Sequence, residues 1–205
     1  MRIGILGNGL MAEALGGQWV RAGHEVMIGG RSLDRAAEVA KRVGAAAGSL
    51  EEAAAYGEVV LLAVPAEVAV EVAALVPAGS TLIDCTNSID HRDFTLAQPR
   101  TAELIAAAVP GVQVVKAFNS AADLVWSDPP AGLGVPMCGD GDLELVAELV
   151  RDLGCEPVYA GGLRRATLLE ATAVLAIGIW VGGGDVRGMF PPLARAFGSV
   201  SPDQP

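Results

Sequence analysis

Short apolar runs and amphipathic segments follow one another along this chain from its first residues. The apolar run at residues 2–6 passes without a spacer into a glycine-rich stretch at residues 7–12. An amphipathic segment then extends to Arg21, and a second apolar run ends in Gly29-Gly30-Arg31. This pattern predicts a strand, a tight turn, a helix and a second strand, in that order.

The alternation continues to residue 159. Further strands are predicted at residues 58–64, 80–84, 112–118, 135–139 and 155–159, and helices at 32–43, from 49, at 67–76, 101–109 and 143–153. We expect residues 44–48, 89–99 and 126–134 to be connections without regular structure. Strands that alternate with helices in this way predict an α/β fold, a doubly wound (Rossmann) parallel sheet with a small C-terminal helical element.

That C-terminal element rests on one segment, Ala166–Val181, which is apolar except for Glu170 and its threonines. It is shorter than the roughly 20 residues that a membrane span needs, and it carries a carboxylate. We therefore predict a buried or interface helix and no membrane association.

Composition narrows the functions further. Apolar residues make up 52% of the chain, aromatic residues only 4%, and the net charge is −10 with no basic tract, which argues against nucleic-acid binding. The three cysteines are far apart and form no C-x-x-C pair, and there are only two histidines, so neither disulfides nor a metal site is expected. Together with an N-terminus that lacks a signal-peptide layout, this predicts a cytoplasmic protein.

The glycine-rich stretch has the chemistry of a dinucleotide site. Gly7 allows the tight turn, Gly9 lets the backbone approach a pyrophosphate, and the helix that follows offers free N–H groups to the anion. At the end of the second strand, where NAD-binding sites usually carry Asp or Glu, this chain has Arg31 with Ser32 and Arg35. Two guanidiniums and a hydroxyl suit the 2′-phosphate of NADP, the alternative being a solvated basic start to a helix.

Polar residues also gather at two later strand ends. Thr86 and Asn87 follow one strand, and Asn119 follows another. The carboxyl ends of parallel strands are where such sheets bind ligands, so we expect a second substrate beside the nicotinamide, with ordinary loop capping as the alternative. Asp84 is expected to orient its loop, and Lys116 to be either an active-site donor or a surface residue.

Four stretches resemble the NADPH-dependent coenzyme F420 reductases (F420H2:NADP oxidoreductases). They are the glycine turn, residues 29–35, residues 135–142, and residues 157–163 with 168–170. The last two carry the specificity, because many enzymes share the glycine turn. The chain departs from the family pattern in lacking a Thr in the first turn, in having Gly30 where Ser is common, and in having Asn119 where F420-specific members carry His.

The resemblance implies that hydride passes between NADP(H) and coenzyme F420. It implies that Asn8, Gly9, Leu10 and Met11 hold the pyrophosphate, that Gly30, Arg31 and Arg35 take the 2′-phosphate, and that Val64 and Pro65 lie beside the nicotinamide ribose. Asn119 and Ala121 would face the deazaflavin as the catalytic residues.

It further implies a homodimer formed through the C-terminal helix. We accordingly divide the chain into an NADP-binding domain at residues 1–160, a helical dimerisation element at 161–196 and a disordered tail at 197–205. Two alternative functions stay open: an NADPH-dependent reductase of another acceptor (a flavin, an imine or a biosynthetic intermediate) and a non-catalytic dinucleotide sensor.

Overall fold

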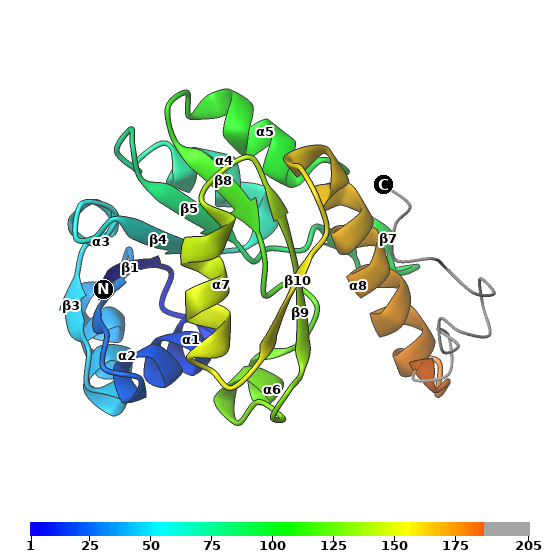
Figure 1. Cartoon of the computed structure of the whole chain (residues 1–205), viewed down its shortest axis with the longest axis horizontal. Coiled ribbons are helices and arrows are strands. Elements are labelled where there is room, and N and C mark those ends of the chain that lie inside the picture. Colours follow the sequence, from blue (N-terminus) through cyan, green and yellow to red (C-terminus); the bar gives the residue numbers. More distant parts are fainter. Residues whose placement is uncertain (187–205) are drawn as a thin grey trace, which may run out of the picture.

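The computed structural model describes residues 1–186, and an eight-stranded sheet with helices on both faces forms its centre (Figure 1). The sheet order is β10-β9-β8-β5-β4-β1-β2-β3, and β6 and β7 form a separate hairpin. The strands are β1 Arg2–Leu6, β2 Glu25–Gly29, β3 Ala46–Gly48, β4 Val59–Leu62, β5 Thr81–Asp84, β6 Ile89–Asp90, β7 Thr95–Leu96, β8 Gln113–Lys116, β9 Gly134–Gly139 and β10 Glu156–Tyr159. The helices are α1 Leu10–Arg21, α2 Leu33–Val43, α3 Leu50–Ala54, α4 Ala66–Ala73, α5 Thr101–Ala108, α6 Asp123–Ser127, α7 Leu143–Arg151, the 3₁₀ turn η1 Leu163–Arg165 and α8 Ala166–Val181. The predicted α/β class is confirmed.

The central strands are apolar along their whole length because both faces of the sheet are covered. In β1, Ile3 and Ile5 belong to the core shared with α1, α2 and α7, whereas Leu6 belongs to the core shared with α3, α4 and α5. All four residues of β4 are buried. The continuous apolar runs in the sequence therefore mark strands with a helix layer on each side.

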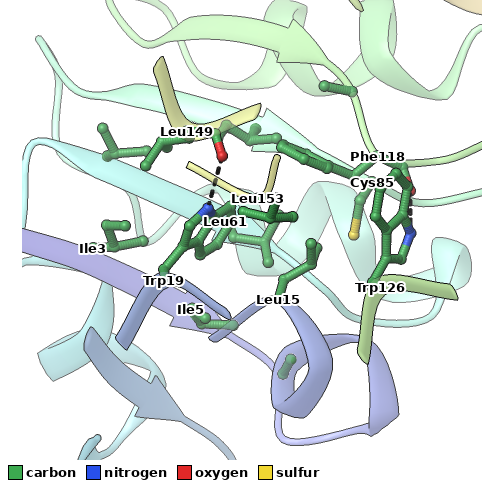
Figure 2. Close-up of a cluster of buried hydrophobic side chains, with 14 of the residues drawn as sticks. Ile3, Ile5, Leu15, Trp19, Leu61, Cys85, Phe118, Trp126, Leu149 and Leu153 are labelled. Atoms are coloured by element: carbon green, nitrogen blue, oxygen red, sulfur yellow. Dashed lines mark hydrogen bonds between the residues drawn. The ribbon is translucent and has the colours of Figure 1, made fainter. Parts of the chain in front are cut away.

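Two tryptophans anchor the first of these cores (Figure 2). The indole of Trp19, on α1, is fully buried and donates its N–H to the carbonyl of Leu149 on α7, at 3.3 Å. Its ring meets Phe118 edge to face, with centroids 5.7 Å apart, and Trp126 meets the other side of Phe118 at 5.4 Å. These contacts join α1, α6 and α7 across the end of β8.

Both predicted helix starts after β2 and β3 have the expected caps. The Ser32 hydroxyl accepts a hydrogen bond from the N–H of Arg35, and Gly44 ends the helix in the left-handed conformation. Ser49 and Glu52 form the reciprocal capping box at the start of α3. Side chains that satisfy free backbone groups fix where these two helices begin.

The sheet is parallel, as predicted, except at one pairing. β9 pairs with β8 in the antiparallel direction, and only Val115↔Gly139 and Lys116↔Cys138 are in register. A parallel neighbour needs a long crossover connection. Between β8 and β9 the only regular element is the five-residue α6, so the chain turns back at the same end of the sheet.

The three segments predicted to lack regular structure each contain a short element, and those predictions were wrong. Residues 44–48 include the edge strand β3, residues 89–99 include the β6–β7 hairpin, and α6 covers the start of residues 126–134. These elements are two to five residues long. An element that short has no room for a hydrophobic period, so the pattern of the sequence could not reveal it.

The long apolar helix α8 has the predicted bounds. It contacts α5, β7 and β9, and leaves Leu168, Leu175 and Trp180 exposed. No helix among residues 1–186 is long and apolar enough to cross a membrane. The predicted tail at residues 197–205, and the part of the dimerisation element beyond residue 186, lie outside the described residues.

Candidate functional site

The order of the strands puts a crevice at the carboxyl ends of β1 and β4. β1 is flanked by β2, which leads outward to β3, and by β4, which leads to β5 and β8 on the other side. Connections that leave in opposite directions open a ligand crevice at such a point. A cavity of ≈ 540 Å³ lies there, and the predicted site residues that line it are Gly7, Asn8, Gly9, Gly30, Arg31, Arg35, Val64 and Pro65.

Two glycines of the turn have different physical roles. Gly7 has a φ of +129°, and a Cβ on it would lie 2.1 Å from the carbonyl oxygen of Ala63. The fold itself therefore requires glycine at this position. Gly9 has an ordinary φ of −92°, and a Cβ on it would meet no atom within 4 Å. The space beside Gly9 is free for a ligand.

The first turn of α1 faces this space. Gly9 caps the helix, and the first N–H to close an intrahelical bond is that of Glu13, which donates to the Gly9 carbonyl at 3.1 Å. The N–H groups of Leu10, Met11 and Ala12 precede it and have no helical carbonyl to bind. Free N–H groups and the positive end of the helix dipole suit a pyrophosphate.

Basic side chains lie at the other end of the same cavity. Arg31 and Arg35 line it from the start of α2, and among residues 1–186 no carboxylate forms an ion pair with either guanidinium. In a chain of net charge −10, two unpaired arginines at one cavity favour an anionic ligand.

Ser32 is the one predicted site residue that lines neither cavity of the site. Its hydroxyl caps α2, and its carbonyl accepts a hydrogen bond from the Asn8 amide at 3.4 Å. The Asn8 amide also explains the glycine at position 30, because a Cβ there would lie 2.3 Å from Asn8 Nδ2. Ser32 therefore supports the phosphate end of the cavity through the backbone.

A second cavity of ≈ 370 Å³ adjoins the first and shares Gly9, Ala63, Val64 and Pro65 with it. The predicted residues Leu10, Met11, Thr86, Asn87, Asn119 and Ala121 line its remaining wall. The structure thus brings fourteen of the fifteen predicted site residues to two connected cavities.

The amides of Asn87 and Asn119 are paired across the second cavity. Asn87 Nδ2 donates to the Asn119 carbonyl at 2.7 Å, and Asn119 Nδ2 donates to Asn87 Oδ1 at 3.0 Å. Asn119 Oδ1 is buried and has no partner among the described residues. A buried acceptor without a donor is costly unless a ligand supplies one.

The turn that carries Asn119 has a strained backbone, and a buried tryptophan stabilises it. Phe118, immediately before it, has a φ of +61°, which is unfavourable for a bulky residue. The indole N–H of Trp126 lies within hydrogen-bonding distance of the Phe118 and Ala121 carbonyls, at 3.2 and 3.0 Å. The buried tryptophan thereby fixes the turn that carries both residues expected to face the second ring.

The other candidate groups are buried away from the ligand space. Asp84 Oδ1 accepts from the N–H and hydroxyl of Thr86, at 2.9 and 2.7 Å, which is the expected loop-orienting role. Lys116 is fully buried and lines neither cavity, so it is not a surface residue. Cys138 is a fully buried core cysteine, and burial raises the pKa of its thiol to about 11.

Sequence reasoning missed the apolar and acidic lining of the cavities. The additional residues are Leu50, Glu51, Ala63, Val68, Glu71, Val72, Leu75 and Cys85. Most belong to α3 and α4, which begin directly after the carboxyl ends of β3 and β4. The predicted start of a helix at Ser49 was a usable signal, because the first turns of helices that follow parallel strands border the crevice.

The fold and these cavities define a Rossmann-type dinucleotide-binding protein with a second ligand space beside the dinucleotide. Comparison with known proteins identifies the family within this class. The family model described as NADP oxidoreductase, coenzyme F420-dependent, matches residues 2–88. The F420-dependent NADP reductase of Methanothermobacter thermautotrophicus is 30% identical over an alignment 206 positions long, which covers 87% of this chain and 89% of the relative. The chain belongs to the F420-dependent NADP reductase family, an oxidoreductase family, as its sequence predicted.

Two solved structures are similar over most of their length. A hypothetical protein of Sinorhizobium meliloti is 28% identical, with a TM-score of 0.72, over 82% of this chain and 87% of its own. A candidate F420-dependent NADP reductase from Arthrobacter sp. FB24 is 23% identical, with a TM-score of 0.79, over 89% of this chain and 95% of its own. The second likeness bears on the fold alone.

The two glycines give a paired prediction. Gly7→Ala should lower the free energy of unfolding by about 1–3 kcal/mol or more, because alanine is strained at positive φ and its methyl group overlaps Ala63. Gly9→Ala should leave the urea midpoint nearly unchanged but weaken NADPH binding at least tenfold, ~1.4 kcal/mol. Unfolding curves and fluorescence titration measure the two effects. NADPH binding by Gly9→Ala at wild-type affinity would contradict the pyrophosphate site.

Proposed function

We propose that this protein transfers hydride between NADP(H) and coenzyme F420, with NADP(H) in the larger cavity and the deazaflavin ring beside the nicotinamide in the smaller one. When bound, the nicotinamide would supply hydride from its C4 and the deazaflavin would accept it at C5, and the negative charge left on the pyrimidinedione ring would be neutralised by a proton from solvent. The protein's part is to hold the two rings together, since such a transfer depends on close approach more than on an acid or a base.

One observation carries the choice of acceptor: among residues 1–186, the smaller cavity is lined by no acid or base of useful strength. No Asp, Glu, His, Lys or Arg of this described part lines it, and burial raises the pKa of the one thiol that does, that of Cys85, to about 12. Reduction of an imine or a carbonyl ends with a proton on nitrogen or oxygen, which a general acid normally supplies. A cavity without such a group favours transfer between two rings.

The Asn87–Asn119 pair supports the same reading. The Asn119 side chain is fixed by its bond to Asn87, and its Oδ1 accepts no hydrogen bond from the described residues, so it can accept one from a ligand. The pyrimidinedione part of a deazaflavin carries N–H groups, and the nicotinamide carboxamide carries another. Val64 and Pro65, common to both cavities, would lie where the two rings meet.

The decisive assay mixes the protein with NADPH and F420 and follows the deazaflavin absorbance, which should fall as the ring is reduced. Ala121→Phe fills the smaller cavity, so F420 turnover should drop at least tenfold, ~1.4 kcal/mol, while the Kd for NADPH changes less than about twofold. Ala122→Phe, at an exposed neighbour, is the matched control. NADPH binding without bleaching would assign another acceptor, and absence of NADPH binding would overturn the proposal.

Cofactor choice rests on the two arginines. Arg31→Ala removes charge-assisted hydrogen bonds to the 2′-phosphate, so the KM for NADPH should rise about 10- to 100-fold, ~1.5–3 kcal/mol, while that for NADH changes little. Steady-state kinetics with both nucleotides measure the difference. Arg151→Ala, which removes a guanidinium bound to Glu144 on α7, should alter neither value. An equal rise in both KM values for Arg31→Ala would refute the 2′-phosphate role.

We also propose that two copies associate through α8, the described part of the dimerisation element assigned to residues 161–196. Leu175 and Trp180 are 52% and 72% exposed on a helix that is apolar all round. Large apolar side chains gathered on one exposed element favour a protein interface.

We also propose a cytoplasmic location, because all three cysteines are free thiols in the described structure.

Leu175→Glu should shift the protein from dimer to monomer, because a carboxylate would be buried without a partner at the interface. Light scattering coupled to size-exclusion chromatography measures the mass. Leu124→Glu, at a residue 80% exposed on α6, should leave the mass unchanged. A wild-type monomer at micromolar concentration would rule out this interface.

A further inference from the structure

Three charged side chains lie buried together where α8 meets the sheet. Lys116 Nζ, at the end of β8, is 2.9 Å from Asp84 Oδ2 at the end of β5 and 3.0 Å from Glu170 Oε1 on α8. None of the three side chains is exposed to solvent. Glu170 is the only charged residue of α8, so its ion pair with Lys116 is the one charged contact between this helix and the sheet.

The cluster reaches the smaller cavity through the loop after β5. Lys116 Nζ also donates to the Thr86 carbonyl, while Asp84 Oδ1 accepts from the N–H and hydroxyl of the same threonine. Thr86 and its neighbour Asn87 line the cavity, but Asp84, Lys116 and Glu170 do not. The cluster therefore acts on the cavity wall by holding this loop.

The same loop is tied to α8 a second time. It continues into the β6–β7 hairpin, whose Phe94 has a φ of +54°. A Cβ on Gly178 of α8 would lie 2.9 Å from the Cβ of Phe94, so the hairpin and the helix are in close contact. Both ends of the segment from Asp84 to Phe94 are thus fixed against one helix.

Stability alone is a poor reason for such a cluster. Two carboxylates share one ammonium in a site without water contact, and replacing such groups by apolar residues is often neutral or stabilising. Burial raises the pKa of Glu170, whereas burial alone would lower the pKa of Lys116, which the two carboxylates hold above its usual value. Hydride transfer between two rings does not require these groups as acids or bases. We therefore look for their role in the positions of the residues that they hold.

We propose that Glu170 is a positioning residue: by holding Lys116, it couples the docking of α8 to the geometry of the Thr86–Asn87 loop in the acceptor cavity. This proposal rests on the proposed function for its kinetic consequence, but the coupling itself does not depend on which acceptor is used. Through it, the helix that we assign to the dimer contact also sets one wall of the active site.

The experiment compares Glu170→Leu, which removes the carboxylate that forms an ion pair with Lys116, with Glu170→Gln, which keeps a polar side chain of the same length beside the Lys116 ammonium. Glu170→Leu should lower kcat for F420 reduction about tenfold or more and leave the Kd for NADPH within about twofold. Glu170→Gln should retain most of the wild-type kcat. Glu148→Leu, the same substitution at an exposed residue of α7, is the control and should behave as wild type.

Amide hydrogen exchange provides a readout that is independent of F420. In Glu170→Leu the peptide covering residues 85–88 should exchange about tenfold faster or more, because Lys116, released from Glu170, no longer fixes the Thr86 carbonyl and the Asp84 carboxylate that accepts the Thr86 N–H. The glycine turn at residues 7–10 should be unchanged. If Glu170→Leu does not fold, Glu170→Asp, which withdraws the carboxylate by one methylene, should show the same two effects at smaller size.

Unchanged exchange at residues 85–88 in a folded variant would overturn the coupling. Equal acceleration across the whole chain would also overturn it, because that result describes general destabilisation. A wild-type protein that reduces no F420 would refute the proposed function alone, since the exchange comparison still decides the role of Glu170.

Discussion

The contact between the glycine turn and the end of β4 is the constraint on which the rest of the site depends. Gly7 donates its N–H to the Gly29 carbonyl at 2.9 Å, and Ala63 donates to the Leu6 carbonyl at 2.9 Å, so the ends of β1, β2 and β4 are joined at one point. No side chain fits between Gly7 and Ala63. This close packing fixes the direction in which α1 leaves the sheet, and with it the free N–H groups that begin the helix beside Gly9, a residue common to both cavities. It also sets Val64 and Pro65 between the two cavities.

The acceptor half of the site is assembled differently. Its wall comes from loops after β5 and β8, and their shape depends on contacts between residues far apart in the sequence, such as Asn87 with Asn119. Strain at Phe118 is tolerated because Trp19 and Trp126 both pack edge to face against its ring (Figure 2). The Trp126 indole also bonds the carbonyls of Phe118 and Ala121, on either side of Asn119. The dinucleotide half is thus determined by local backbone geometry, and the acceptor half by side-chain packing.

That difference explains which features of the fold and the site could be predicted from the sequence alone. The α/β class, the caps at Ser32 and Ser49, and the glycine turn were predictable because each depends on neighbours within a few residues. The antiparallel direction of β9 was not, since nothing local distinguishes a strand reached by a crossover from one reached by a return at the same edge. The burial of Lys116 was not predictable either. It depends on the ion pair with Glu170, which is 54 residues further along the chain, and the sequence near Lys116 gives no sign of that contact.

The reversal at β9 also divides the sheet mechanically. The strands from β8 to β2 are linked by ladders of four or five register positions, whereas β9 is in register with β8 at only two positions and carries β10 with it. What joins this outer pair to the rest is mainly side-chain packing, with α7 and the Trp19–Leu149 hydrogen bond across the seam. The Trp19 indole and its apolar neighbours are therefore among the contacts that couple the unfolding of the outer strands to that of the strands around the nucleotide crevice.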